Sequence, residues 1–353
     1  MTLVEHRRNN FDLVRLVAAS QVLWMHATRH LGLALPQPLA TFDAIVNTIP
    51  GVPAFFVVSG FLITDTWMRQ PDARIYARNR ILRVYPALWA CLLFAIMLAV
   101  GFGHGPAMVR NPGELLLWLA AQASVLQVWN PDFLRGFGVG VLNGSLWTIP
   151  VELQFYLVLP LLLLLPRRVL LPVFVTSAVC FAVVEGPRPL PAVNHVVLAS
   201  LAPHLFGFGI GVLARLRAAR VLPFVVGRFG FWLALHLAVQ LGLRAAGLAE
   251  DPWAEALSRP LLGAVVLSAA FSMPGLAGRL LRGNDVSYGL YLVHMPVLNA
   301  VIASGAAGRW DTAMAAMAAC YGLALLSWLA VERPALRLKR GRAPALRPEA
   351  RPG

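Results

Sequence analysis

The chain alternates between apolar runs of about twenty residues and short polar joins rich in Pro and Gly. A helix of about twenty apolar residues crosses the ~30 Å hydrocarbon core of a membrane. We therefore predict an all-α, polytopic membrane helix bundle with about ten transmembrane helices. The expected spans are residues 12–31, 44–66, 84–102, 145–165, 169–185, 194–214, 223–247, 257–274, 285–304 and 311–332.

Residues 114–129 form an eleventh apolar stretch, which is only about 24 Å long as a helix. If this stretch does not cross the membrane, all the basic clusters of the chain fall on one side, as the positive-inside rule requires. We therefore predict a re-entrant or interfacial element here, with both chain termini in the cytoplasm. Residues 1–334 form the expected membrane domain, and the basic, Pro-rich residues 335–353 a disordered cytoplasmic tail.

Composition supports this class, since 58% of residues are hydrophobic and 13% are charged. The net charge of +14 comes from Arg residues at the ends of apolar runs and in the tail, which topology explains better than nucleic-acid binding. The three Cys residues lack metal-ligand spacing, and no glycine-rich phosphate loop is present. The four histidines at 104, 195, 204 and 236 also show no metal-ligand pattern with one another. We expect a lipid bilayer as a partner, no metal and no nucleic acid.

Two ionisable residues, Arg15 and His26, interrupt the first apolar run. Eleven positions bring a helix back to nearly the same face, about 16 Å further along its axis. Ionisable groups at membrane depth face a protein interior or a cavity and are candidates for function. The structural alternative is an interfacial Arg and a His that hydrogen-bonds to a neighbouring helix. Alone, the pattern does not decide between the two.

A second basic group lies at the start of the third span, in RIYARNRILRVYP. Arg80 and Arg83 share a helix face, with Arg78 nearby. Guanidinium groups bind phosphate in a bidentate manner, so these residues are candidates for holding a nucleotide-like donor, although they could also act as topology anchors. Glu332, at the cytoplasmic end of the last span, is either a paired interfacial charge or a partner of this Arg group.

A carboxylate lies near the outer end of the fourth span, in NGSLWTIPVELQFYLVLP. Glu152 needs a partner at this depth, which favours a functional role. Pro150 is expected to loosen the helix just above it. Trp147 and Tyr156 offer flat faces with polar tips, suited to stacking on a sugar or to an interfacial aromatic belt.

Ser59 and Gly60 interrupt the second span, in FFVVSGFLIT. Small residues allow close approach of neighbouring helices, so we favour a packing role for this pair.

The ninth span carries a polar stripe in NDVSYGLYLVH, where Ser287, Tyr288, Tyr291 and His294 recur at spacings of three and four. His294 is expected near the membrane midplane. A hydrogen bond between helices and a catalytic or substrate-binding role explain it equally well.

Together these motifs resemble the acyltransferase 3 family, integral membrane O-acyltransferases that move acyl groups, commonly acetyl, from acyl-CoA to sugar hydroxyls. The resemblance covers Phe11 to about Pro334, and its most specific part is the Arg-ten-residues-His pattern of Arg15 and His26. FFVVSGFLIT, the RxxRxxP run, the block around Glu152, SYGLYLVH and the closing ERP also match. Pro53, Asn79 and Gln154 depart from the residues usual in the family.

The resemblance implies that Arg15 and His26 are essential, that the Arg group engages acetyl-CoA or another acyl-CoA, and that Glu152 and Glu332 are further candidates. His26, with an ordinary imidazole pKa near 6.5, suits a general base that activates a sugar hydroxyl. We expect a stand-alone, multi-pass protein of the bacterial inner membrane whose acceptor is a glycolipid, polysaccharide or glycosylated metabolite. The alternative is a transporter or flippase of a lipid-linked sugar, since intramembrane His, Glu and Arg also form substrate paths.

Overall fold

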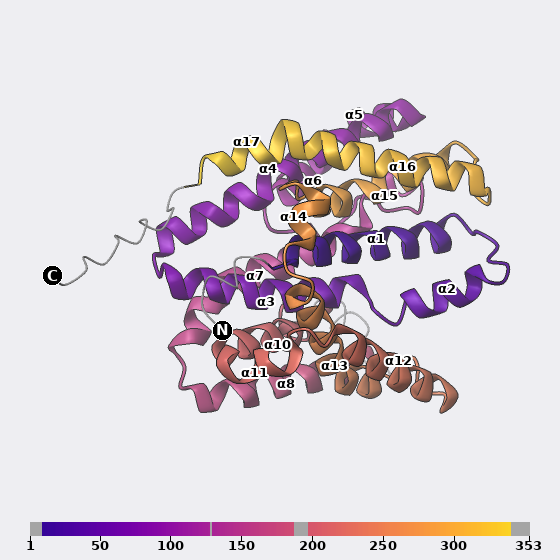
Figure 1. The fold of residues 1–353 in the computed structure, drawn as a ribbon. Helices are drawn as coiled ribbons and strands as arrows, with labels where there is room; N and C mark the ends of the chain where they lie inside the picture. The colour runs from indigo at the N-terminus through magenta and orange to yellow at the C-terminus, as the bar shows by residue number, and fades with distance from the viewer. Residues whose placement is uncertain (1–8, 128, 187–196, 340–353) are drawn as a thin grey trace.

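The computed structural model describes residues 9–127, 129–186 and 197–339, and within these ranges the chain is helical with no strand (Figure 1). Short 3-10 or π-helical turns occur at 100–104, 132–134, 144–147 and 328–332. The α-helices are α1 (Phe11–His30), α2 (Leu39–Val46), α3 (Gly51–Arg69), α4 (Ala73–Ala99), α5 (Gly105–Arg110), α6 (Pro112–Ala123), α7 (Thr148–Leu164), α8 (Arg167–Glu185), α10 (Leu205–Leu216), α11 (Ala218–Val225), α12 (Phe229–Ala245), α13 (Pro252–Phe271), α14 (Leu276–Leu281), α15 (Ser287–Ala303), α16 (Trp310–Ser327) and α17 (Arg333–Arg337).

Six helical segments of the described chain are long and apolar enough to cross a membrane. A seventh is possible if α11 and α12, which meet at an 83° bend, count as one broken span. The multi-pass character is therefore confirmed, whereas the count of ten and the location of the termini stay predictions. The six segments are Leu39–Arg69, Ala73–Arg110, Gly144–Leu164, Arg167–Glu185, Pro252–Phe271 and Trp310–Arg337.

Of the remaining expected spans, 12–31 and 285–304 correspond to α1 and α15, and the other two differ for physical reasons that can be traced to the sequence. The span expected at 223–247 is broken where Gly227 adopts a positive φ of 70°, a conformation that ends a helix. The span expected at 194–214 becomes α10, only about 18 Å long, because residues 199–204 form turns. The stretch expected not to cross, 114–129, contains α6, which is also about 18 Å long.

Helix α15 occupies the centre of the bundle, packed against α1, α4 and α16 (Figure 1). All residues from Ser287 to Asn299 are buried. Its polar side chains are therefore surrounded by protein rather than lipid, which removes the cost of placing them at membrane depth.

Helices α3 and α10 approach each other closely enough to exclude any side chain at two glycines. A Cβ atom on Gly60 would lie 2.0 Å from the carbonyl oxygen of Phe208, and one on Gly211 would lie 2.1 Å from that of Val57. The predicted packing role of Gly60 is therefore confirmed. This contact fixes the face of α3 that carries Ser59.

Candidate functional site

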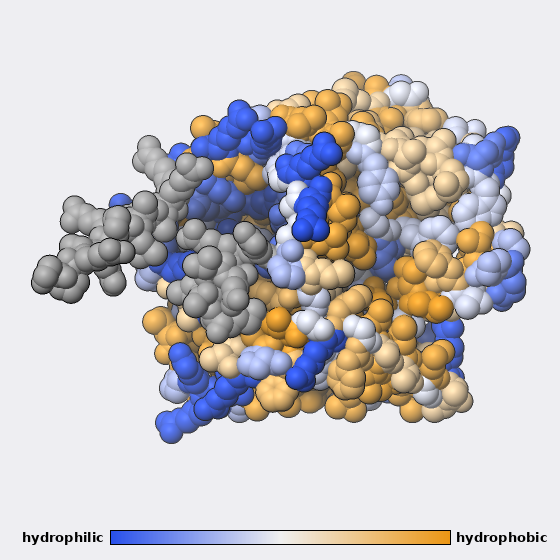
Figure 2. All heavy atoms as spheres, viewed as in Figure 1, coloured by the Kyte–Doolittle hydropathy of each residue, from blue (hydrophilic) through white to orange (hydrophobic). Residues whose placement is uncertain are grey.

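A pocket of about 400 Å³ opens at the end of the bundle where α1 and α4 begin and α3 ends. We call it the charged pocket, because its lining includes seven acidic or basic side chains: Asp12, Arg15, Arg80, Arg83, Glu152, Asp285 and Lys339. Figure 2 shows hydrophilic side chains around a hollow at this end, beside a largely hydrophobic flank. The lining runs along α3 from Thr66 to Val52, about 21 Å of helix, so the pocket is deep and narrow.

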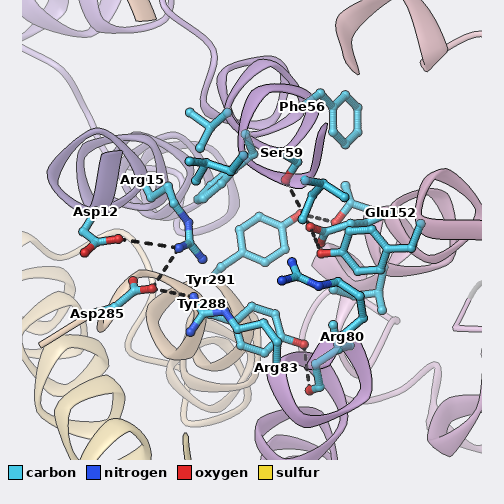
Figure 3. Close-up of a pocket in the computed structure, with 18 of the residues that line it drawn as sticks. Asp12, Arg15, Phe56, Ser59, Arg80, Arg83, Glu152, Asp285, Tyr288 and Tyr291 are labelled. Carbon is cyan, nitrogen blue, oxygen red and sulfur yellow. Dashed lines mark hydrogen bonds and ion pairs between the residues drawn. The ribbon is translucent and has the colours of Figure 1, made fainter. Parts of the chain in front are cut away.

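One carboxylate, Asp285, joins the two predicted Arg motifs inside the pocket (Figure 3). Its Oδ2 atom lies 2.8 Å from Nη1 of Arg15 and 2.6 Å from Nη2 of Arg83. Asp12 lies 3.8 Å from the same Arg15 nitrogen, and Glu332 lies 3.7 Å from Arg83. Buried guanidinium groups need such partners, so this network holds the start of α1, α4 and α15 together.

Arg80 differs from Arg15 and Arg83 because aromatic rings hold it. Its guanidinium carbon lies 5.9 Å from the ring centre of Tyr76 and 5.5 Å from that of Tyr156. Its Nε atom is buried and makes no hydrogen bond within the part of the chain that the structure describes. Arg80 therefore keeps hydrogen-bonding capacity for a ligand, and Figure 3 shows its guanidinium directed into the open centre of the pocket.

Lys339 adds a cation at the mouth of the charged pocket, just beyond α17. Burial and the neighbouring guanidinium groups of Arg80, Arg83 and Arg15 lower its pKa to about 7. An anion bound beside it would favour the charged ammonium form. Residues 340–353, which hold most of the expected tail, lie outside the described residues.

Glu152 faces the pocket from the second turn of α7. Its Oε1 atom accepts hydrogen bonds from the hydroxyl of Tyr156 and, at 3.1 Å, from Ser59 Oγ. Ser59 therefore contributes to the site in addition to its position beside the α3–α10 contact. The expectation that Pro150 loosens the helix is wrong, because α7 begins at Thr148 and Pro150 falls in its first turn, where proline costs no hydrogen bond.

The two candidate histidines form a pair beyond the blind end of the pocket. His26 Nδ1 lies 2.8 Å from His294 Nε2, and the rings are stacked with centres 5.0 Å apart. His294 is fully buried, while His26 is partly exposed and lies beside the exposed His30. Neither histidine lines the charged pocket, so Arg15 and His26 do not open into one shared cavity.

Tyr291 stands between the charged pocket and the histidine pair. It lines the blind end of the pocket, and its ring centre lies 5.8 Å from that of His294. Its hydroxyl donates to the carbonyl oxygen of Ser145 at 2.9 Å and lies 2.9 Å from the Thr148 hydroxyl. The phenol ring therefore acts as a wall held in place by the start of α7.

Of the other residues proposed from sequence, some line the charged pocket and others lie elsewhere in the bundle. Tyr156 and Tyr288 line the charged pocket, and Tyr288 also packs its ring 5.6 Å from the Arg83 guanidinium. Ser287 is buried and donates to Asp285 at 2.6 Å. Arg78 does not line the charged pocket. Trp147 contacts His204 and belongs to a different pocket at the opposite end of the bundle.

Three site residues were missed by the sequence reasoning: Asp12, Asp285 and Lys339. A signal existed for the two acids, because an Arg at membrane depth requires a carboxylate, and Asp285 directly precedes the polar stripe of α15. No local signal marked Lys339, whose position depends on how α17 returns to the pocket. Within the described residues, no group of three or more His, Cys, Asp or Glu side chains could hold a metal ion.

A pocket lined with Arg side chains, with a histidine pair behind it, thus lies within a multi-pass membrane protein. The family model described as "Acyltransferase domain" matches residues 8–332, so the chain is a member of the acyltransferase 3 family. The resemblance seen in the sequence is thereby confirmed.

Three relatives are similar to this chain over nearly its whole length. "Nodulation protein 10" of Rhizobium leguminosarum bv. viciae is 35% identical over 347 residues, covering 94% of each chain. "O-acetyl transferase" of Shigella phage Sf6 is 24% identical over 93% of this chain and 96% of that protein. "Acyltransferase MdmB" of Streptomyces mycarofaciens is 25% identical over 94% of each chain. No solved structure matches the chain.

Proposed function

We propose that this protein transfers an acyl group, acetyl in the simplest case, from acyl-CoA to a sugar hydroxyl. The observation that carries the proposal is a series of side-chain contacts. Tyr291 lines the charged pocket and contacts His294, and His294 contacts His26. It connects a deep site suited to a phosphate-bearing donor with an imidazole suited to a general base. Relatives named as an O-acetyl transferase and an acyltransferase support the same reaction class.

The donor end of the reaction is assigned to the charged pocket. Arg80 and Lys339 would bind the phosphates of CoA, since the Arg80 Nε atom makes no hydrogen bond within the described chain, whereas Arg15 and Arg83 are already bound to Asp285. The depth of about 21 Å along α3 suits a long thioester arm that points toward Tyr291. Basic residues at this end of the bundle favour the cytoplasm, the compartment where acyl-CoA is made.

His26 is assigned as the base and His294 as the residue that positions it. If His26 Nδ1–H donates to His294 Nε2, the Nε2 lone pair of His26 is free to accept a proton. The sugar hydroxyl oxygen then attacks the thioester carbonyl carbon while His26 Nε2 takes the hydroxyl proton. The carbon–sulfur bond breaks, and the CoA thiolate takes that proton from His26, which leaves the ester and the free thiol. The Tyr291 ring must move aside for the carbonyl to reach His26.

The test uses membranes that contain the protein, labelled acetyl-CoA and the envelope glycans of a host strain lacking the gene. We expect His26→Ala to lower label transfer by at least a thousandfold, because general-base and positioning effects both disappear. His294→Gln keeps an acceptor for Nδ1–H and should retain more activity than His294→Leu. His30→Ala, one turn further along α1, is the matched control and should leave transfer near the wild-type rate.

Two outcomes would refute this function. Transfer by the His26→Ala variant at the wild-type rate would remove the proposed base. Movement of unmodified lipid-linked sugar across the membrane, without label in any glycan, would favour the transporter alternative.

A further inference from the structure

A second pocket, of about 410 Å³, lies at the opposite end of the bundle from the mouth of the charged pocket. Its walls come from the second half of α4, from α6, and from the segment that leads into α7. We call it the tryptophan pocket, because three tryptophans and four amide side chains line it: Trp118, Trp129, Trp147, Gln122, Gln127, Asn130 and Asn143.

The chemistry of the two pockets is different. Among the described residues that line the tryptophan pocket, no side chain is charged, whereas the charged pocket has seven acidic or basic groups. A site that offers indole faces and amides without ions suits a neutral ligand with both apolar faces and hydroxyl groups. An anionic donor such as acyl-CoA would lose its hydration there without gaining a cation.

Two of the residues that line this pocket carry a buried polar atom that has no partner within the described chain. Nε1 of Trp118 is a donor and Oε1 of Gln127 is an acceptor, and both make no hydrogen bond. The two residues are only 1% and 5% exposed. Buried polar groups are almost always paired, so an unpaired donor and an unpaired acceptor on one pocket indicate a ligand that supplies both, as a hydroxyl group does.

The amides of the pocket are held in fixed positions by the backbone. Gln122 Nε2 donates to the Trp129 carbonyl at 2.9 Å, and Gln127 Nε2 donates to the carbonyl oxygens of Gln122 and Ser124. Asn130 Nδ2 donates to Gly140 O at 3.1 Å. Because these side chains are already ordered, a ligand would not have to order them on binding.

The pocket is connected to the histidine pair through one short segment. Asn143 Nδ2 donates to Leu292 O at 2.9 Å, and Ser145 accepts the Tyr291 hydroxyl at its carbonyl oxygen. Leu292 and Tyr291 lie within one turn of His294 on α15. A ligand in the tryptophan pocket therefore contacts the segment that holds both the Tyr291 wall and the residue that positions His26.

From these observations we infer that the tryptophan pocket binds a neutral sugar of the acceptor, delivered from the end of the bundle opposite to the donor. That this sugar is the acceptor rests on the proposed function, but sugar binding itself can be tested without any acyl transfer. Trp118 and Gln127 would hydrogen-bond sugar hydroxyls, and Trp147, which is 36% exposed, would stack on a sugar ring at the rim.

The experiment measures sugar binding to the purified His26→Ala protein in nanodiscs by saturation-transfer NMR. The probes are the methyl glycosides of glucose, galactose, mannose and N-acetylglucosamine, with methyl glucuronide as the charged control. We expect saturable binding of at least one neutral glycoside and at least tenfold weaker binding of the glucuronide. Trp118→Phe removes the unpaired donor together with part of the indole ring and should weaken binding of the neutral sugar at least about fivefold, the usual effect of one hydrogen bond.

Trp147→Ala should also weaken binding, whereas Trp89→Phe is the matched control. Trp89 is exposed on α4, lies outside the pocket, and uses its Nε1–H on the carbonyl of Ala123. The inference would be overturned if no neutral glycoside bound saturably. It would also be overturned if the His26→Ala protein bound the glycoside equally well with and without the added Trp118→Phe change. Loss of binding in Trp118→Phe without any acyl transfer by the wild type would keep the sugar site and refute the proposed function instead.

Discussion

At the scale of single residues, the site is organised by the cost of placing charge at membrane depth. Arg15 and Arg83 come from different helices, and both find the same carboxylate oxygen of Asp285. Removing either partner from such a network leaves an uncompensated charge, which costs several kcal/mol in buried pairs, about 3–5 in measured cases. The Arg residues named from sequence therefore divide into two roles. Arg15 and Arg83 hold the site together, and Arg80 is available for ligand.

The pKa of Lys339 gives a pH dependence that can be measured. It is lowered from 10.5 to about 7 by burial and nearby guanidinium groups, so the side chain is neutral above pH 7 and charged below it. A phosphate-bearing donor binds the charged form, so donor binding above pH 7 must take up a proton. We expect the KM for acyl-CoA to rise with pH above 7, by up to about tenfold per unit. Initial rates at varied donor concentration from pH 6 to 9 measure this.

The matched variant for this prediction is Lys339→Arg, because a guanidinium stays charged throughout the range. Its KM for acyl-CoA should be nearly independent of pH. A rise in KM with pH of the same size in Lys339→Arg and in the wild type would assign the effect to another group.

At the scale of helices, close contact between α3 and α10 sets the geometry of the pocket wall. A carbonyl oxygen of α10 lies where a Cβ atom on Gly60 of α3 would have to be, and a carbonyl oxygen of α3 lies where a Cβ atom on Gly211 of α10 would have to be. The same turn of α3 carries Ser59, which donates to Glu152. A glycine that permits close packing and a serine that contacts the site thus share one segment, FFVVSGFLIT.

Gly60→Ala tests this packing. The new Cβ would meet backbone 2.0 Å away, so the helices must separate, and we expect a loss of at least about 2 kcal/mol of stability. Gly242→Ala in α12 has nothing within 4 Å of its Cβ and should leave stability unchanged or raise it slightly. Thermal unfolding of both variants in the same detergent measures the difference. Equal melting temperatures would show that α3 and α10 are not in close contact.

The sequence predicted helices well where the apolar period was uninterrupted and less well where one residue decided the outcome. The spans at 169–185 and 311–332 correspond to α8 and to α16 with its continuation, whereas Gly227 broke the span expected at 223–247. Arg15, His26 and Glu152 stood out because polar residues are rare in apolar runs. Asp285 and Lys339 did not, because their importance arises from contacts between segments far apart in the chain, which periodicity does not encode.

At the scale of the whole molecule, two pockets with different chemistry open at opposite ends of one bundle. The charged pocket suits a phosphate-bearing donor, and the tryptophan pocket suits a neutral sugar. Tyr291, which lines the charged pocket, and His294 belong to the buried helix α15, and His26 contacts His294 from α1. The proposed transfer across a membrane requires that donor and acceptor reach one base from separate entrances, and two pockets at opposite ends of the bundle would provide those entrances.

The orientation of the bundle decides whether this arrangement can work. The positive-inside rule predicts that the mouth of the charged pocket faces the cytoplasm, together with the turn between α3 and α4. The turn between α15 and α16 then lies outside. Single cysteines at the exposed positions Ala73 and Ala307 distinguish the two sides. A membrane-impermeant maleimide applied to cells with a permeabilised outer membrane should label Ala307→Cys nearly completely and Ala73→Cys only at background, whereas lysed cells should show both.

The unsubstituted protein is the control for this labelling, since its own cysteines are buried or half-buried. The reverse labelling pattern would place the charged pocket outside the cell, where acyl-CoA is absent. In that case Arg80 and Lys339 would have to bind some other anion, and the acyl-CoA donor would be refuted even if His26 proved essential. The expected pattern, in contrast, fixes both the side of the donor and the side from which a sugar reaches the tryptophan pocket.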